Sequence, residues 1–284
     1  MTRRNERGIS TVVDVSVFLL LVGAAVFSVA TAADASADDT VSITADRDEA
    51  TVETLATTTA TVQYDLGVDD RTGEPIERAR HGTLAELLAD AAVANATVDG
   101  APLSPYAVGF VDAVGATVSP LLDGRTQVAA TWRPIPGSTL AGQVRLGPDP
   151  PTDSTVHAAT LTVDSGIPPT SDRARSASVG GYGHVADVVA RGTVDGLFPP
   201  RRTRVALDGD GADAVVARER FASMRSAYDS ETTFEAGVEP ARADLTAAVS
   251  NRTTRTLESQ FETPRAAAAA VRTGSVHIVV RTWS

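Results

Sequence analysis

The 284-residue chain contains no cysteine and no lysine. Because cysteine is absent, the chain forms no disulfide bond, offers no thiolate metal ligand and has no cysteine nucleophile, so a folded domain must depend on its hydrophobic core. Because lysine is absent, the phosphate-binding lysine of a Walker-type loop is excluded. Hydrophobic residues make up 43% of the chain, which is enough for a sizeable core and argues against disorder throughout.

Charge is strongly one-sided, because 36 acidic residues face 25 arginines and the formal net charge is −11. Such a surface repels a phosphate backbone, and Arg201, Arg202 and Arg204 do not belong to a basic domain, so no nucleic-acid partner is expected. Abundant aspartate, alanine, valine and threonine without lysine resemble the composition of haloarchaeal proteins. Near-molar salt shortens the Debye length to about 3 Å and relieves the repulsion within an acidic surface, so we expect folding to need salt.

An apolar run without any charged residue covers residues 15–33. A helix of this length is about 28 Å long, which matches the hydrocarbon core of a bilayer. Arg3, Arg4 and Arg7 precede the run, whereas Asp34 follows it directly. The distribution of arginines therefore predicts a single-pass protein of the cell membrane, in contact with membrane lipid, with a cytoplasmic N-terminus and an extracellular C-terminal part.

The string RGISTVV at residues 7–13, followed by Asp14 and SVFLLL, resembles the signal segment of archaeal type IV pilins and Tad-type pseudopilins. The resemblance is limited to this N-terminal segment. It implies that a prepilin peptidase cuts between Gly8 and Ile9, and that the retained helix packs against other pilin-like subunits. It also implies that Asp14 pairs with the amino terminus of a neighbouring subunit. Alternatively, Asp14 lies at the lipid headgroups and stabilises the first turn of the helix.

Two other interpretations of the N-terminal segment stay open. Ala30, Thr31 and Ala32 form an A-x-A site after a basic start and an apolar stretch, as in a secretory signal peptide whose removal releases a soluble protein. The run exceeds the roughly 7 to 15 residues usual for such a signal, which favours a retained helix. A retained helix could also be a plain anchor that no peptidase cuts.

The whole chain predicts a basic leader at residues 1–8, a transmembrane helix at 9–33, an acidic stalk at 34–56 and an extracellular α+β domain at 57–284. Stretches rich in β-branched residues predict strands at 57–66, 126–133, 155–164 and 275–283. Helical periodicity predicts helices at 84–95, 105–122, 182–197, 212–228, 240–261 and 264–272. Glycine and proline clusters indicate a candidate subdomain boundary near residues 166–181.

The sequence predicts no catalytic residue, no cofactor and no metal site. The histidines show none of the spacings that hold a metal ion. Asp208, Asp210 and Glu219 take three places of a calcium-binding loop, but Asp213 replaces its turn glycine and the following residues have a helical pattern. Two sequons, at Asn95 and Asn251, make these residues candidate N-glycosylation sites on the outer side.

These observations favour a non-enzymatic function. The leading hypothesis is a membrane-anchored structural or accessory component of an extracellular pilus or secretion-like apparatus, assembled through its N-terminal helix. The alternative is a secreted or anchored envelope protein that binds a ligand or catalyses a reaction at a site formed only by the fold.

Overall fold

The computed structural model describes residues 42–69, 75–209 and 211–284. The chain divides into a unit of residues 1–43 and a larger unit, Thr44–Ser284, which is called the head below. The apolar run, the cleavage site at Gly8 and Ile9, and the assembly residue Asp14 lie outside the described residues. Within the described ranges, no helix is both long and apolar enough to cross a bilayer.

The head contains both helices and antiparallel strands, so it is an α+β structure, as the sequence predicts. The helices are α2 (Ser42–Thr57), α3 (Leu84–Ala94), α4 (Val108–Val118), α5 (Ser171–Ala177), α6 (Tyr182–Leu197), α7 (Pro200–Asp208), α8 (Ala212–Ala227), α9 (Val238–Gln260) and α10 (Pro264–Ala269). The strands are β1 (Thr59–Asp69), β2 (Pro75–Thr83), β3 (Ala96–Val98), β4 (Ala101–Pro102), β5 (Thr126–Trp132), β6 (Leu140–Leu146), β7 (Val156–Asp164) and β8 (Ser275–Trp283).

An antiparallel sheet with the strand order β4-β3-β6-β5-β8-β7 forms the centre of the head. The last strand of the chain, β8, lies between β5 and β7, and Ile278 is opposite Ala130 of β5 and Leu161 of β7. Residues of β8 alternate between buried and half-buried, because successive side chains point to opposite faces of a sheet. The buried set, which includes Val276 and Val280, faces the main core.

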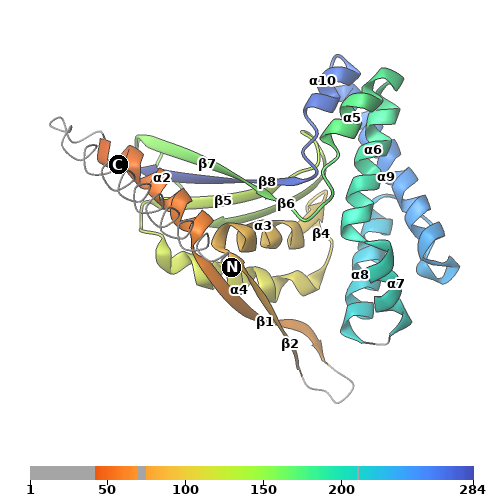
Figure 1. Cartoon of the computed structure of the whole chain (residues 1–284), viewed down its shortest axis with the longest axis horizontal. Helices are drawn as coiled ribbons and strands as arrows, with labels where there is room; N and C mark the ends of the chain where they lie inside the picture. The colour runs from red at the N-terminus through yellow and green to blue at the C-terminus, as the bar shows by residue number, and fades with distance from the viewer. Residues whose placement is uncertain (1–41, 70–74, 210) are drawn as a thin grey trace, which may run out of the picture. The chain divides into compact units, whose positions relative to one another are not determined.

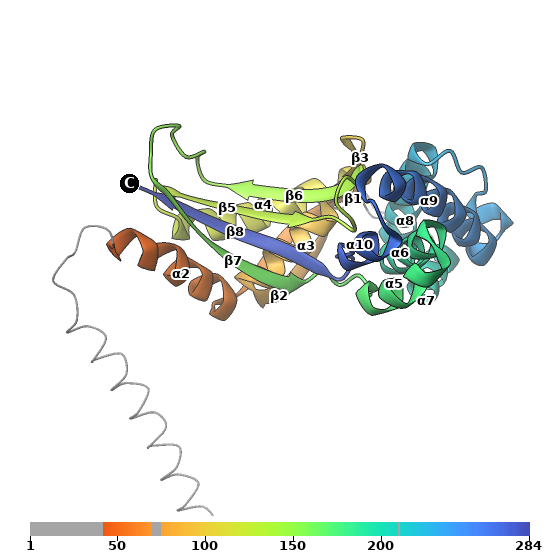
Figure 2. The same cartoon turned by 90° about the horizontal axis from the view of Figure 1, so that it is seen from above.

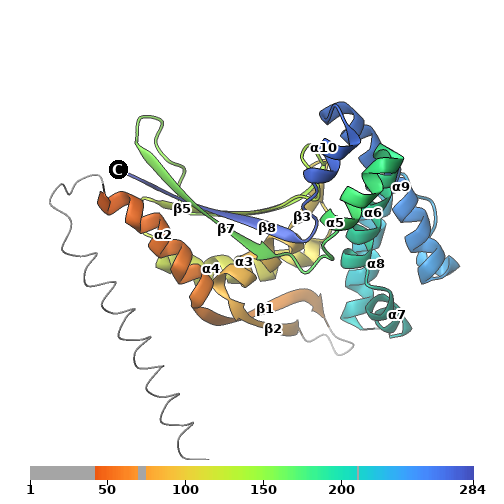
Figure 3. The same cartoon turned by 45° about the horizontal axis from the view of Figure 1, so that its top comes forward.

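Helix α3 covers one face of this sheet and packs against β5, β6 and β8 (Figure 3). It begins with a capping box, in which Thr83 Oγ1 accepts from the Glu86 backbone N–H and the Glu86 carboxylate accepts from the Thr83 backbone N–H. Its apolar residues Leu84, Leu87 and Leu88 are at most 1% exposed. Helix α4 packs against both α3 and β1, and β1 pairs with β2 in a separate two-stranded ribbon.

Helices α5 to α10 form a helical insertion, residues 165–274, between two neighbouring strands. Strand β7 ends at Asp164, directly opposite Ser275 at the start of β8, so the chain leaves and re-enters the sheet at the same place. Figure 2 shows these strands running toward the helices of the insertion. Its central pair is α6 and α9, with α7 and α8 packed beside them (Figure 1). Residues 166–181, where the sequence indicates a candidate subdomain boundary, lie at the start of this insertion, and the head as a whole is one compact unit.

The two ends of the insertion are joined by buried polar contacts. Ser165 Oγ donates to the Thr273 carbonyl oxygen at 2.8 Å, and the Thr170 and Thr273 hydroxyls are 2.9 Å apart. Thr273 Oγ1 also donates to the Pro168 carbonyl oxygen at 3.0 Å. Since the three hydroxyl-bearing residues are at most 3% exposed, these bonds satisfy groups that water cannot reach. They fix the position at which the insertion leaves the sheet.

The structure differs from the sequence-based expectations at several elements. Residues 34–56 were predicted to form an acidic stalk, but from Ser42 onward they belong to helix α2. The helix is held on the head because Val52 and Leu55 lie one turn apart and pack on the main core. Helix α7, which is not among the predicted helices, begins at Pro200 directly after Pro199, because proline fits the first turn of a helix. The segment of residues 166–181 likewise contains a helix, α5. Strands β2 and β6 were not predicted, since β2 is largely charged and exposed and β6 has Gly142 in place of an apolar side chain at one of its buried positions.

Candidate functional site

The two candidate glycosylation sites differ in how far the acceptor nitrogen is accessible. Asn95 is the C-cap residue of α3 and is half-buried, and its Nδ2 donates to the Gln143 carbonyl oxygen at 2.8 Å. A glycan on this nitrogen would replace one of its two N–H groups directly beside this half-buried contact. Asn251 lies in the middle of α9 with an exposed side chain. The geometry therefore favours Asn251 over Asn95 as an acceptor.

The structure does not assemble a calcium loop from residues 208–219. Asp208 ends α7, and Glu219 lies within α8, which begins at Ala212 and holds these residues in a helix instead of a loop around an ion. Asp210 lies outside the described residues. Elsewhere in the described chain, no group of three histidine, cysteine, aspartate or glutamate side chains could hold a metal ion.

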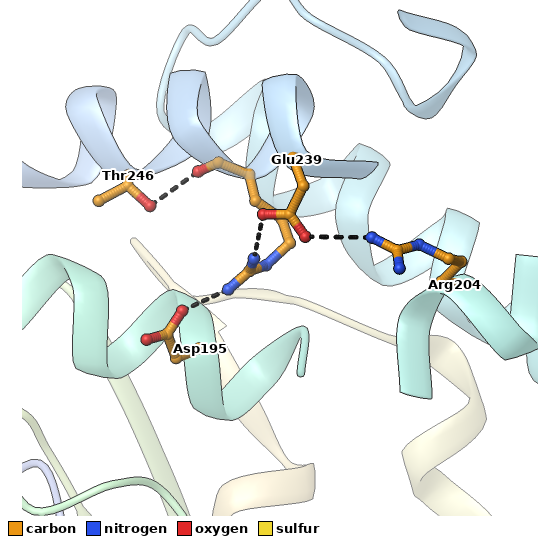
Figure 4. A network of polar contacts seen from close by, with 5 residues as sticks. Asp195, Arg204, Glu239 and Thr246 are labelled. Atoms are coloured by element: carbon orange, nitrogen blue, oxygen red, sulfur yellow. Dashed lines mark hydrogen bonds and ion pairs between the residues drawn. The ribbon is translucent and has the colours of Figure 1, made fainter. Parts of the chain in front are cut away.

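A buried ion-pair network ties three helices of the insertion together (Figure 4). The side chain of Arg242 on α9 is 8% exposed, and its guanidinium donates to Asp195 of α6 and, at 3.1 Å, to Glu239. Glu239 in turn pairs with Arg204 of α7 at 3.6 Å. The network also contains an unsatisfied group, because Arg242 Nε is fully enclosed and has no partner. It fixes α6, α7 and α9 relative to one another, and α7 forms one wall of the groove described next.

A groove of about 1010 Å³ is lined by residues of α7 and α8, together with the end of α6 and two residues of β2. It is called the arginine groove below, because Arg78, Arg201, Arg202 and Arg220 line it. The only acidic side chain that lines it in the described chain, Asp213, accepts from Arg78 Nη2 at 2.9 Å. The described residues that line the groove therefore carry a net positive charge, in a protein whose formal net charge is −11.

Arg220 differs from the other arginines of the groove in its surroundings. It is half-buried as a residue, and desolvation by burial lowers the pKa of its guanidinium below the ordinary value. Within the described residues, this guanidinium makes no hydrogen bond and no ion pair. Its nitrogens are not among the fully enclosed unpaired atoms of the described chain, and Arg220 is one of the residues that line the groove. An arginine keeps its charge under all ordinary conditions, so the groove holds an uncompensated cation.

The arginine groove was not predicted from the sequence. Arg201 and Arg202 were noted only as close neighbours in an acidic chain, and Arg78 and Asp213 are 135 residues apart. One feature of the sequence could nevertheless have indicated an anion site. The arginine pair directly after Pro199 and Pro200 puts positive charge in the first turn of a helix. That position normally favours negative charge.

The head is thus an α+β protein in which a helical insertion between paired strands carries an arginine-lined groove. The chain belongs to a family of unknown function (DUF7284), whose model matches residues 13–283. Neither a curated protein nor a solved structure matches the chain.

Proposed function

We propose that this protein is a membrane-tethered extracellular component of a pilus or secretion-like apparatus, processed between Gly8 and Ile9 and assembled through its apolar N-terminal segment. The observation that carries this proposal is the extent of the family match, which begins at residue 13 and so includes the apolar run of residues 15–33. A helix that stays on the mature protein and packs against partners is under sequence constraint together with the head. A signal peptide that is removed has no such constraint beyond its general pattern.

The way in which the chain enters the head supports this proposal. The first described element is α2, and its residue Leu55 is 1% exposed in the main core. Val52, one turn earlier, packs against the same core. A force applied through α2 is therefore carried into the core of the head and not into a solvated linker. A subunit that is held in an assembly through its N-terminal segment needs such a connection.

The experiment that tests this proposal uses Asp14→Ala in the full-length protein, expressed in a host that assembles it. We expect the variant to insert into the membrane normally but to yield smaller complexes after detergent extraction, measured by sedimentation. Asp34→Ala is the matched control, because it removes a carboxylate at the other end of the apolar run and should leave the complexes unchanged. Wild-type complexes that sediment as monomers, or an Asp14→Ala variant that sediments like wild type, would contradict the proposal.

A further inference from the structure

The arginine groove combines three features that each favour the binding of an anion. The first is its lining, in which only Asp213 among the described lining residues is acidic, and this carboxylate already pairs with Arg78. Arg201, Arg202 and Arg220 make no hydrogen bond or ion pair through their side chains within the described chain. Among the described residues, these three guanidinium groups thus share one concave surface without a carboxylate paired to any of them.

The second feature is the burial of one of these cations. An exposed arginine without a partner is solvated and costs nothing, as for Arg201 and Arg202, which are exposed. The Arg220 guanidinium has lost part of its hydration and has gained no hydrogen bond in return, which is unfavourable for a charged group. A bound anion would supply both the charge and the acceptor atoms that the protein leaves out.

The third feature is the orientation of helix α7. Its N-terminus lines the groove, its N-cap residue is Pro199, and it has neither a side-chain cap nor an acidic residue in its first turn. Arg201 and Arg202 occupy that turn instead, next to the positive end of the helix dipole. The first backbone N–H groups of a helix have no acceptor within the helix and are available to an anion. Positive side chains at this position are stabilised when an anion lies between them and the helix end.

A neighbouring groove shows that this charge imbalance is not general in the insertion. A groove of about 460 Å³ on the other side of α7 and α8 is also lined by three arginines, namely Arg204, Arg218 and Arg225. Two carboxylates, Asp208 and Glu235, line it as well, and Arg204 is paired with Glu239. Among the described lining residues, the excess of arginines over carboxylates is thus larger in the arginine groove than in its neighbour.

We propose that the arginine groove is a binding site for a phosphate ester, with Arg220 as its central contact and Arg201 and Arg202 at its rim. Arginine donates two parallel N–H groups, which match two oxygens of a phosphate, and the three unpaired cations can compensate either the single charge of a phosphodiester or the two charges of a phosphomonoester. Val205, which is 73% exposed, lies in the same groove and offers an apolar surface to the body of the ligand. The phosphate can belong to a soluble metabolite or to a lipid headgroup, and both present the same chemistry. This site goes beyond the proposed role in assembly and does not depend on it.

The test is direct binding of inorganic phosphate and phenyl phosphate to the full-length protein in non-ionic detergent and concentrated KCl, measured by calorimetry. The melting temperature is followed in parallel, because a ligand that binds the folded state raises it. We expect both compounds to bind, and phenyl phosphate to bind more tightly because of its apolar ring. Arg220→Met, which keeps most of the side-chain volume but removes the charge, should weaken binding about tenfold or more. Absence of binding by both compounds, together with the vesicle result below, would overturn the proposal.

The stability of Arg220→Met and two further variants separate a binding role of Arg220 from a structural one. Without ligand, Arg220→Met should melt at the wild-type temperature or above it, because it removes an uncompensated buried charge. A double variant, Arg201→Gln with Arg202→Gln, changes only exposed side chains and should also weaken phosphate binding. Arg255→Gln, at an exposed arginine of α9 outside the groove, should leave binding unchanged. Binding of phosphate that is unaffected by both groove variants would assign it to another place and contradict the proposal.

The source of the phosphate is distinguished by reconstitution into vesicles of phosphatidylcholine with or without phosphatidylglycerol. An increase in melting temperature with phosphatidylglycerol, lost in Arg220→Met, would support the site and identify a lipid headgroup as its ligand. Binding of phenyl phosphate without any effect of phosphatidylglycerol would support the site and identify a soluble phosphate ester. If neither soluble phosphate nor phosphatidylglycerol acts through Arg220, the arginine groove is not a phosphate site.

Discussion

The indole Nε1 of Trp132 donates a hydrogen bond of 2.9 Å to the carbonyl oxygen of Thr273. Trp132 ends the central strand β5, and Thr273 lies just before β8, at the end of the helical insertion. Both residues are at most 1% exposed. This single bond therefore joins the sheet to the point at which the insertion returns to it. The Ser165 and Thr170 contacts with Thr273 lie beside it and join the start of the insertion to its end.

Trp132→Phe tests how much this connection stabilises the head. The substitution keeps most of the aromatic packing but leaves the Thr273 carbonyl oxygen with fewer donors in a buried place, so we expect a loss of about 1–3 kcal/mol in the free energy of unfolding. Chemical denaturation in high salt measures it. Trp283→Phe, at the other tryptophan near the sheet edge, should cost less, because no hydrogen bond from its indole is present in the described chain. Equal losses would show that the Trp132 bond contributes nothing beyond packing.

The Arg242 network predicts a difference between a buried and an exposed ion pair. Asp195→Ala removes one of the two carboxylates that face the enclosed Arg242 guanidinium, and because Asp195 is itself 51% exposed we expect a loss of about 1–2 kcal/mol. The exposed pair of Arg191 and Asp187, 2.8 Å apart within α6, provides the control. Asp187→Ala should cost at most about 0.5 kcal/mol. Similar losses in both variants would mean that burial does not strengthen the network.

Arg242→Met provides a complementary test of the same network. This substitution removes the charge together with its unsatisfied Nε, so it should destabilise the head less than Asp195→Ala does. Thermal unfolding of the two variants under one salt condition compares them directly. A larger loss in Arg242→Met would show that the guanidinium contributes more than its desolvation costs.

Asp244 contributes to the pH dependence of stability. The Ser230 hydroxyl donates to its carboxylate at 2.6 Å and the Thr232 backbone N–H at 3.2 Å, and these bonds lower its pKa below the ordinary value of 3.8. Because the folded-state pKa lies below the unfolded one, the contribution is fully present above about pH 4 and is lost as the pH falls through the folded pKa. The difference in unfolding free energy between wild type and Asp244→Asn should therefore shrink on acidification. A difference that is constant from pH 6 to the acid limit of folding would contradict this assignment.

Two glycines predict opposite effects of substitution by alanine. A Cβ atom on Gly142 of β6 would lie 1.8 Å from the Ala92 carbonyl oxygen, so Gly142→Ala must displace α3 from the sheet. We expect this substitution to destabilise the head by about 3 kcal/mol. A Cβ on Gly183, in the first turn of α6, meets nothing within 4 Å. Gly183→Ala should stabilise the head by about 0.5–1 kcal/mol, because alanine loses less backbone entropy in a helix. The melting temperature should fall in Gly142→Ala and rise in Gly183→Ala, and a change in the opposite direction in either variant would contradict its prediction.

Elements with a strong periodic pattern were predictable from the sequence. The bounds of α6 and β8 agree with the expected ones, since both have uninterrupted apolar periodicity and glycine at or before their first residue. Strand β2 was missed because its sequence PIERARHGT is largely charged and exposed, so that only its pairing with β1 makes it a strand. Tertiary pairing thus decided what local propensity could not.

The arginine groove could not be predicted from the sequence for a different reason. Charge counted along the chain showed an acidic protein, whereas the groove depends on which arginines the fold leaves unpaired. Arg78 is neutralised by Asp213 from a distant part of the chain, and Arg220 has no partner within the described residues. Only the packing of α7 and α8 beside β2 makes this distinction visible.

The central claim, that the apolar N-terminal segment stays on the protein after pilin-like processing, is tested most directly by the N-terminal sequence and intact mass of the protein purified from its native membrane. The claim predicts a mature chain that begins at Ile9. A chain that begins at Ala33 would show that the segment is removed and the head released, and a chain that begins at Met1 or Thr2 would show an anchor without this processing. Either of the last two results would contradict the proposed mode of assembly.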